Sequence, residues 1–130
     1  MFNDHSHTSF SQNWNGRLFA DVFSDAREYN PEKYVVGSLH DIFLKSKKIG
    51  VAEVVASRKF RFCEIRDAFS YLICGQPAYY LAAMLTKFYA PKDSMVHPDK
   101  EFIHVIWKWK TRDLDVQNYL ITEWWKETNA

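Results

Sequence analysis

The stretch that decides the fold is residues 39–62, LHDIFLKSKKIGVAEVVASRKFRF, in the middle of the chain. Two apolar runs, 39–44 and 49–56, are separated by the polar turn 45–48, and short apolar runs bounded in this way are typical of strands. In residues 58–62 charged and aromatic side chains alternate, so the two phenylalanines face one side of a strand and the lysine and second arginine face the other. Three strands in succession predict a meander or the wall of a barrel.

The segments on either side of this centre predict the remaining elements. From residue 102 the side chains alternate again, and the odd-numbered residues, among them Trp107 and Trp109, form one strongly apolar face. Elsewhere, apolar residues recur at the spacing of a helix. We expect a flexible arm over residues 1–13, a buried extended piece or short helix over 18–23, helices over 64–72 and 77–88, a strand over 102–109, and a closing helix over 113–127.

Composition limits the class of protein. The 130 residues fit one domain, residues 14–130 after the arm, and an apolar fraction of 47% supplies an ordered core. Seventeen Lys and Arg against sixteen Asp and Glu leave a net charge of +1, which excludes a strongly basic nucleic-acid binder, so any basic surface is local. Cys63 and Cys74 have no metal-binding or disulfide spacing, and we expect no metal, no cofactor and a cytoplasmic location. No segment has the pattern of a membrane span or secretory signal, so we expect no membrane partner.

Six short motifs occur in a consistent order between residues 18 and 110. They are Ala26-Arg27 after an apolar segment, Tyr34-Val-Val-Gly37, the strand-like run 49–55, Phe62-x-x-Ile65-x-Asp67, Tyr89 at the end of the second helix, and the strand-like run 102–107. Together they resemble the ASCH family of the PUA-like superfamily, small β-barrels associated with RNA and modified nucleotides. The resemblance implies an α+β fold, a small PUA-like mixed β-barrel with flanking helices, to which this chain adds an extra C-terminal helix.

The same resemblance points to Arg27 as a residue at the mouth of a cleft beside the barrel. Its expected neighbours in the cleft are Ser24, Asp25 and Tyr34. Arginine suits a site that grips a phosphate or a base edge, because its guanidinium is planar, always charged and rich in donors. The alternative is a structural role, in which Arg27 forms an ion pair with Asp25 or Glu28.

The resemblance does not carry over a catalytic site. Family members that remove an acyl group from acetylated cytidine are expected to use a Lys, a Thr and a Glu. The aligned positions in this chain are Val22, Asp25 and Cys74. A valine can neither transfer a proton nor act as a nucleophile, so we assign no catalytic residue and favour a protein that is not an enzyme.

One segment of the chain is locally basic. Between residues 45 and 66 there are seven Lys and Arg against two acidic residues, with aromatic residues interleaved. Such a surface suits the phosphates of single-stranded nucleic acid, although a solvated outer face of a barrel would show the same pattern. We expect six of these cations to form one continuous positive face: Lys45, Lys47, Lys48, Arg58, Lys59 and Arg61.

Three functions stay open from the sequence. The leading hypothesis is a binding module that holds RNA, other single-stranded nucleic acid or a modified nucleotide in the Arg27 cleft beside the basic face. The second is a nucleic-acid enzyme, either a ribonuclease or a nucleoside amidohydrolase. The third is a protein-interaction or inhibitor module, which the near-neutral charge and the tryptophan-rich C-terminal part would suit.

Overall fold

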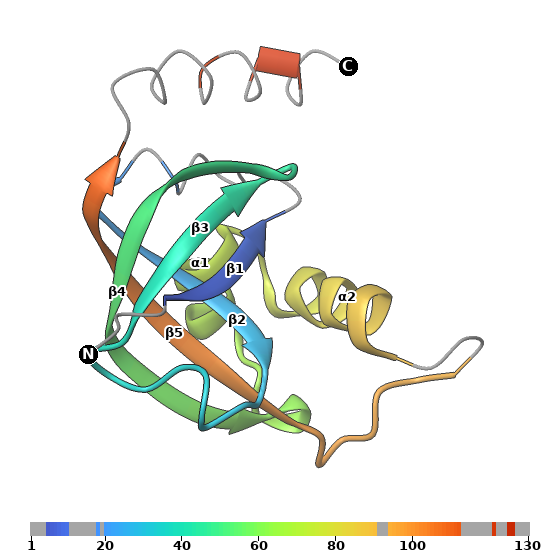
Figure 1. Ribbon diagram of the computed structural model, residues 1–130. Helices are drawn as coiled ribbons and strands as arrows, with labels where there is room; N and C mark the ends of the chain where they lie inside the picture. Colours follow the sequence, from blue (N-terminus) through green and yellow to red (C-terminus); the bar gives the residue numbers. More distant parts are fainter. Residues whose placement is uncertain are drawn as a thin grey trace.

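The computed structural model describes residues 5–10, 18, 20–90, 94–112, 121, 125 and 126. Over these residues the chain forms a five-stranded mixed sheet with the strand order β1-β3-β4-β5-β2, and two helices lie beside it (Figure 1). The strands are β1 (Ser6–Phe10), β2 (Val22–Glu28), β3 (Leu39–Leu44), β4 (Lys47–Arg61) and β5 (Glu101–Arg112). The helices are α1 (Asp67–Cys74) and α2 (Ala78–Tyr89), and a short 3-10 helix, η2 (Phe62–Glu64), precedes α1. No helix in this part of the chain is long and apolar enough to cross a bilayer.

The sheet curls into a half-barrel whose two edge strands come close to each other. β1 runs parallel to β3, and the other neighbouring strands are antiparallel. At the opening, the rings of Phe10 on β1 and Phe23 on β2 are 6.0 Å apart between centroids. No ladder joins β1 to β2 in the described sheet. The half-barrel therefore has a seam between β1 and β2 that side chains bridge.

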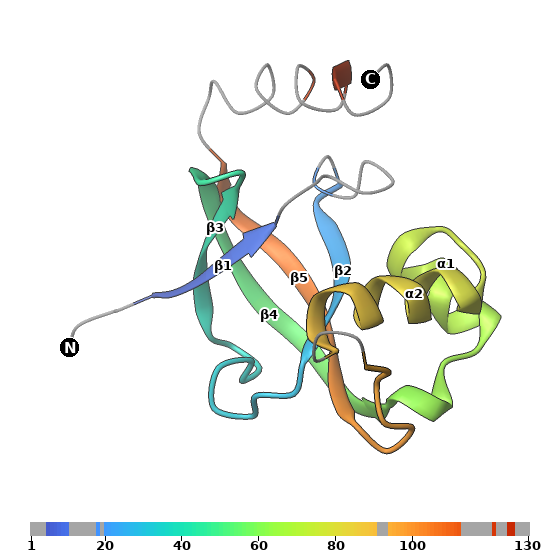
Figure 2. The ribbon, with the colours of Figure 1, turned by 90° about the vertical axis from the view of Figure 1, so that its right-hand side faces the viewer.

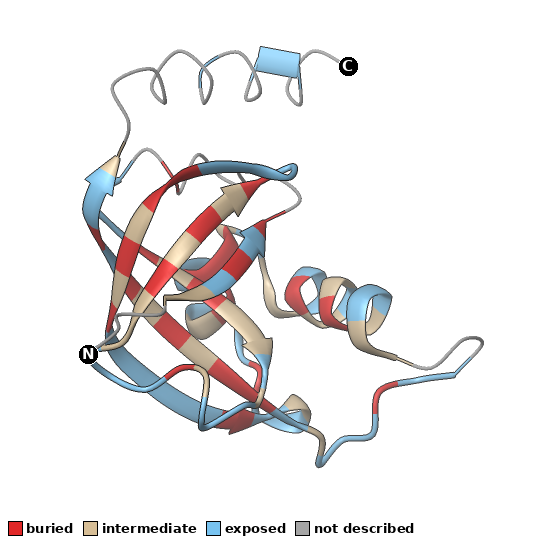
Figure 3. Ribbon diagram, viewed as in Figure 1, coloured by how far each residue is buried: buried red, intermediate tan, exposed pale blue. Residues whose placement is uncertain are grey.

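Two hydrophobic clusters hold the elements together. The first fills the concave face of the sheet around Trp107, which is fully buried against Phe23, Tyr34 and His40. The second lies where α1 and α2 pack beside the sheet, around the fully buried Phe102 (Figures 2 and 3). Strand β5 contributes to both clusters, so it is the centre of the fold.

The central stretch forms two strands rather than the three that its pattern predicts. The predicted strands 49–56 and 58–62 are largely the two halves of β4, a single strand of 15 residues. The ladder between β4 and β5 shifts register between Val54 and Ala56, and a bulge of this kind bends a strand without ending it. Five consecutive exposed residues begin at this point, so the alternating pattern breaks where the strand continues.

The other predicted elements of the described chain are present with small changes. The predicted strand 102–109 is β5, and the predicted helices 64–72 and 77–88 are α1 and α2, with boundaries that differ by one to three residues. The last two residues of segment 18–23 begin β2. Together these elements confirm a small α+β fold built on a mixed half-barrel.

The structure describes part of the predicted N-terminal arm but little of the predicted C-terminal helix. Within the expected arm 1–13, five residues form β1 and are docked on β3, where the Thr8 hydroxyl lies 2.8 Å from His40 Nδ1. An edge strand of mostly polar residues gives little sequence signal, so the arm looked unstructured. The predicted closing helix 113–127 lies outside the described residues, except for Ile121, Trp125 and Lys126.

Candidate functional site

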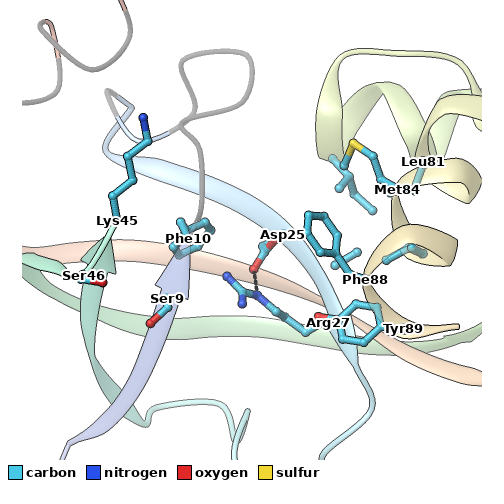
Figure 4. Close-up of a pocket in the computed structure, with 13 residues that line it drawn as sticks. Ser9, Phe10, Asp25, Arg27, Lys45, Ser46, Leu81, Met84, Phe88 and Tyr89 are labelled. Atoms are coloured by element: carbon cyan, nitrogen blue, oxygen red, sulfur yellow. Dashed lines mark hydrogen bonds and ion pairs between the residues drawn. The ribbon is translucent and has the colours of Figure 1, made fainter. Parts of the chain in front are cut away.

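A cavity of about 510 Å³ opens at the seam between the two edge strands. Its walls come from β1, β2, the turn between β3 and β4, and α2, with one residue of α1 (Figure 4). Small-molecule sites occupy roughly 300–1,000 Å³, so the cavity has room for a ligand of nucleotide size.

An ion pair between Arg27 and Asp25 forms the polar floor of the cavity. The two residues are two positions apart on β2, so both side chains point to the same face of the sheet. Arg27 Nε donates to Asp25 Oδ2, and the side chains of Arg27 and Asp25 keep only 19% and 5% of their area exposed. The guanidinium carbon also lies 4.5 Å from the centre of the Phe10 ring. Arg27 therefore bridges the seam, from the carboxylate on its own strand to the aromatic ring on β1.

The surroundings of the floor fix the charge of its basic and phenolic groups. Burial opposes the charge of the Arg27 guanidinium, but the adjacent Asp25 carboxylate outweighs this and holds the pKa of Arg27 above its ordinary value. Burial raises the pKa of Tyr89, which lines the cavity, and raises the pKa of Tyr34 to about 12. At neutral pH the cavity therefore presents a charged guanidinium and a protonated phenol.

Arg27 has donors that its ion pair does not use. The hydrogen bond to Asp25 occupies Nε, and neither Nη atom has a hydrogen-bond partner among the described residues. Three described side-chain polar atoms are fully buried without a partner, and they belong to His104, Trp107 and Trp109. The two Arg27 Nη atoms are not among them, so both reach solvent. Figure 4 shows the guanidinium between Phe10 and the side chains of α2. A planar set of N–H donors in such surroundings suits phosphate oxygens or the acceptors of a base edge.

The opposite wall is apolar and belongs mostly to α2. Leu81, Leu85 and Phe88 follow one another at spacings of four and three residues on one side of the helix, with Met84 beside them. Leu81 and Leu85 are buried in the second cluster, whereas 47% of Phe88 is exposed. A flat apolar ligand surface against Phe88 and Met84 would remove this area from water, which favours binding.

The two-residue turn between β3 and β4 forms the rim of the cavity. Lys45 and Ser46 have φ angles of 50° and 72°, the left-handed region that residues other than glycine rarely adopt. A two-residue hairpin needs this backbone, and Asn-Gly adopts it most readily. The Lys45 N–H donates to the Phe10 carbonyl oxygen at 3.0 Å, which ties the turn to the end of β1.

The structure brings two of the four predicted cleft residues into the cavity. Arg27 and Asp25 line it, and the ion pair between them is the structural alternative that the sequence left open. Ser24 points to the other face of β2, where its hydroxyl donates to the Leu72 carbonyl oxygen at 2.8 Å. Tyr34 is buried in the first cluster. Ser24 and Asp25 separate because neighbouring residues of a strand face opposite sides.

The positions aligned with the catalytic groups of the ASCH enzymes lie apart from one another. Val22 is half exposed at the start of β2, and Cys74 is buried at the end of α1, where its thiol donates to the Ser70 carbonyl oxygen. Of the three positions, only Asp25 lines the cavity, and no histidine or cysteine lines it. The described residues contain no group of three or more His, Cys, Asp or Glu side chains arranged to hold a metal ion.

The length of β4 divides the predicted basic face into two groups. The first group is at the β3–β4 turn: Lys45, Lys47 and Lys48. The second group is at the far end of β4: Arg58, Lys59 and Arg61. At about 3.3 Å per residue the two groups are roughly 30–45 Å apart along the strand. The predicted continuous face is therefore interrupted by the middle of β4.

Carboxylates accompany several of these cations. Among the described residues, acidic groups lie within ion-pair distance of three of these cations: Asp41 with Lys48, Glu101 with Lys59, and Glu64 and Asp99 with Arg61. A phosphate that approached any of these three would compete with a carboxylate already in place. Of the six cations, Lys45 alone also lines the cavity.

Sequence reasoning missed the β1 and α2 sides of the cavity. Phe10 belongs to the expected arm, and no local pattern indicates that a polar segment will pair in parallel with a strand 34 residues later. Met84 and Phe88 have the spacing of core residues, because helical periodicity identifies an apolar side but not whether part of it stays open. Both contributions depend on how the sheet curls, which only the structure shows.

Comparison with known proteins supports the fold. No protein-family model and no curated protein matches the chain. Among solved structures, it is similar to the crystal structure of protein EF3133 from Enterococcus faecalis V583, which is described under the family model DUF984. The TM-score is 0.63 with 10% sequence identity, and the match covers 91% of this chain and 83% of that chain. The likeness shows a shared small fold, and the finer resemblance to the ASCH family has no family match behind it.

Proposed function

We propose that the protein is a cytoplasmic binding module of ASCH type that holds a single nucleotide, free or exposed in RNA, in the cavity at the β1–β2 seam. The observation that supports this most is the partly buried Arg27–Asp25 pair facing an apolar wall across about 510 Å³. A nucleotide has the complementary parts, since it combines a flat base, polar base edges and an anionic phosphate.

The polar floor and the rings offer contacts to the base. The Asp25 carboxylate holds Arg27 by its Nε, so the Arg27 Nη atoms can donate to the acceptors on a base edge. Hydrogen bonds that involve charged groups are stronger than neutral ones, especially where water is partly excluded. Phe88, which is 47% exposed, supplies a ring face, and stacking of a base on an aromatic side chain contributes about 1–3 kcal/mol.

The positions of the cations favour one nucleotide over a long strand. A strand that used both basic groups would have to cross the middle of β4 and displace the carboxylates that accompany Lys59 and Arg61. The cavity, by contrast, gathers Arg27 and Lys45 around one volume. Binding rather than turnover fits the lining, because no lining hydroxyl is hydrogen-bonded to a histidine or carboxylate among the described residues.

The proposal is tested by calorimetric titration with the four ribonucleoside monophosphates and a short single-stranded RNA. Arg27→Lys keeps the charge but removes the planar fork, and it should weaken binding roughly tenfold, as the loss of a charge-assisted contact does. Arg58→Ala removes an exposed arginine of the far basic group and is the matched control, with an affinity expected to stay within about twofold. Absence of binding by every nucleotide and the RNA would refute the proposal, and so would a larger loss in Arg58→Ala than in Arg27→Lys.

A further inference from the structure

The turn between β3 and β4 has residues with side chains at two positions whose backbone conformation favours glycine. Leu44 pairs with Lys47, so Lys45 and Ser46 alone form the loop, and both have positive φ angles. A glycine at the second position would adopt this conformation at lower cost. Residues other than glycine in this region cluster at functional sites, where their side chains serve a purpose that offsets the strain. Both side chains of this turn line the cavity.

The turn presents polar groups of the kind that bind an anion. Neither the N–H nor the hydroxyl of Ser46 has a hydrogen-bond partner among the described residues. Lys45 adds an ammonium group on a flexible side chain, and Figure 4 shows both residues on the side of the cavity away from Phe88. Among the described lining residues there are two cations, Arg27 and Lys45, and one carboxylate, Asp25, so their formal charge is +1.

We propose that Lys45 and Ser46 bind a terminal phosphate, so that the cavity selects a phosphorylated nucleotide over the corresponding nucleoside. The inference rests on the proposed function, because it assumes that the base occupies the space between the Arg27–Asp25 pair and α2. A phosphomonoester brings up to two negative charges and three acceptor oxygens, which match an ammonium, a hydroxyl and a backbone N–H. A free nucleoside monophosphate and the phosphorylated end of an RNA carry this same group.

The test compares ligands with and without the phosphate. Adenosine, adenosine 5′-monophosphate and a four-nucleotide RNA with or without a 5′-phosphate are titrated into the protein and into Lys45→Ala, with Lys47→Ala as the neighbouring control. The protein should bind each phosphorylated ligand roughly tenfold more tightly than its unphosphorylated partner. In Lys45→Ala this ratio should fall to about two with the affinity for adenosine unchanged, whereas Lys47→Ala should keep it. A tighter complex with the phosphorylated RNA than with the mononucleotide would identify the RNA end as the source of the phosphate.

A second variant separates the role of the turn from its strain. Replacing the turn by Asn-Gly, as Lys45→Asn with Ser46→Gly, should raise the melting temperature and abolish the preference for phosphate. Equal binding of phosphorylated and unphosphorylated ligands by the unchanged protein would overturn the inference while leaving the proposed function intact, and so would a preference that survives in Lys45→Ala. If none of the four ligands binds, the inference is overturned, and the proposed function fails as well only if the other three ribonucleoside monophosphates also do not bind.

Discussion

Replacing Arg27 by alanine should destabilise the fold as well as weaken ligand binding. An arginine exposed in a cleft could be removed at a cost of about 0.5 kcal/mol. Arg27 instead keeps 19% of its side chain exposed and pairs with Asp25, which keeps 5%. Removing one partner of a buried ion pair costs roughly 3–5 kcal/mol, and we expect about 3 kcal/mol here because the open cavity lets water reach the site. For a chain of this length that lowers the melting temperature by about 10 °C.

Urea unfolding followed by tryptophan fluorescence measures this loss. The double-mutant cycle of Arg27→Ala and Asp25→Asn should show the double variant less destabilised than the sum of the single variants, by roughly 1–3 kcal/mol. Arg58→Ala is the control and should change the free energy of unfolding by less than about 0.5 kcal/mol, because Arg58 is exposed. The reasoning would be refuted if Arg27→Ala cost as little as the control, or if the two changes were additive.

Three further predictions concern the core, a glycine and the far basic group. Burial lowers the pKa of His40 from 6.5 to about 4, so as the pH falls this residue binds a proton in the unfolded chain before it does in the folded one. The free energy of unfolding should therefore drop by up to about 3 kcal/mol between pH 6.5 and 4, and urea unfolding of His40→Gln at several pH values should lack this dependence. Gly50→Ala should cost about 2–3 kcal/mol in thermal unfolding, because a Cβ at this position would overlap the Thr111 carbonyl oxygen. Gly37→Ala is the comparison and should cost about 1 kcal/mol, because a Cβ there meets open space and only its φ of 92° is unfavourable; the reverse order would contradict the packing of β4 on β5. Lys59→Glu should leave the nucleotide affinity within about twofold at 0.15 M salt, and a tenfold loss would move the site to the end of β4.

Local sequence patterns were sufficient to predict the strands and helices whose surroundings stay the same along their whole length. In β5 the odd-numbered residues enter one cluster, so the alternation around Trp107 predicts a strand directly. In α2 the spacing of Leu81 and Leu85 predicts which side of the helix is buried. In β4, by contrast, the bulge after Val54 interrupts the alternation, and a rule based on period two divides one strand into two.

Only the part of the candidate site that is formed by residues close together in the sequence could be predicted. Arg27 and Asp25 share a face because they are two apart on a strand, and this follows once β2 is recognised. The positions of Phe10 and Lys45 depend on contacts between strands, since β1 pairs with β3 and the turn holds the Phe10 carbonyl oxygen. The expected basic face is divided for a related reason: the sequence shows that the charges are close along the chain, whereas the structure places them near opposite ends of one continuous strand.

The most direct test of the account is amide chemical-shift mapping of a nucleoside monophosphate titrated into isotope-labelled protein. We expect saturable shifts confined to the ends of β1 and β2, the Lys45–Ser46 turn and the α2 residues around Phe88, with the strand segment from Arg58 to Arg61 unaffected. Shifts centred on that segment, or no saturable shift at any amide around the cavity, would contradict the claim that the seam between β1 and β2 is the binding site.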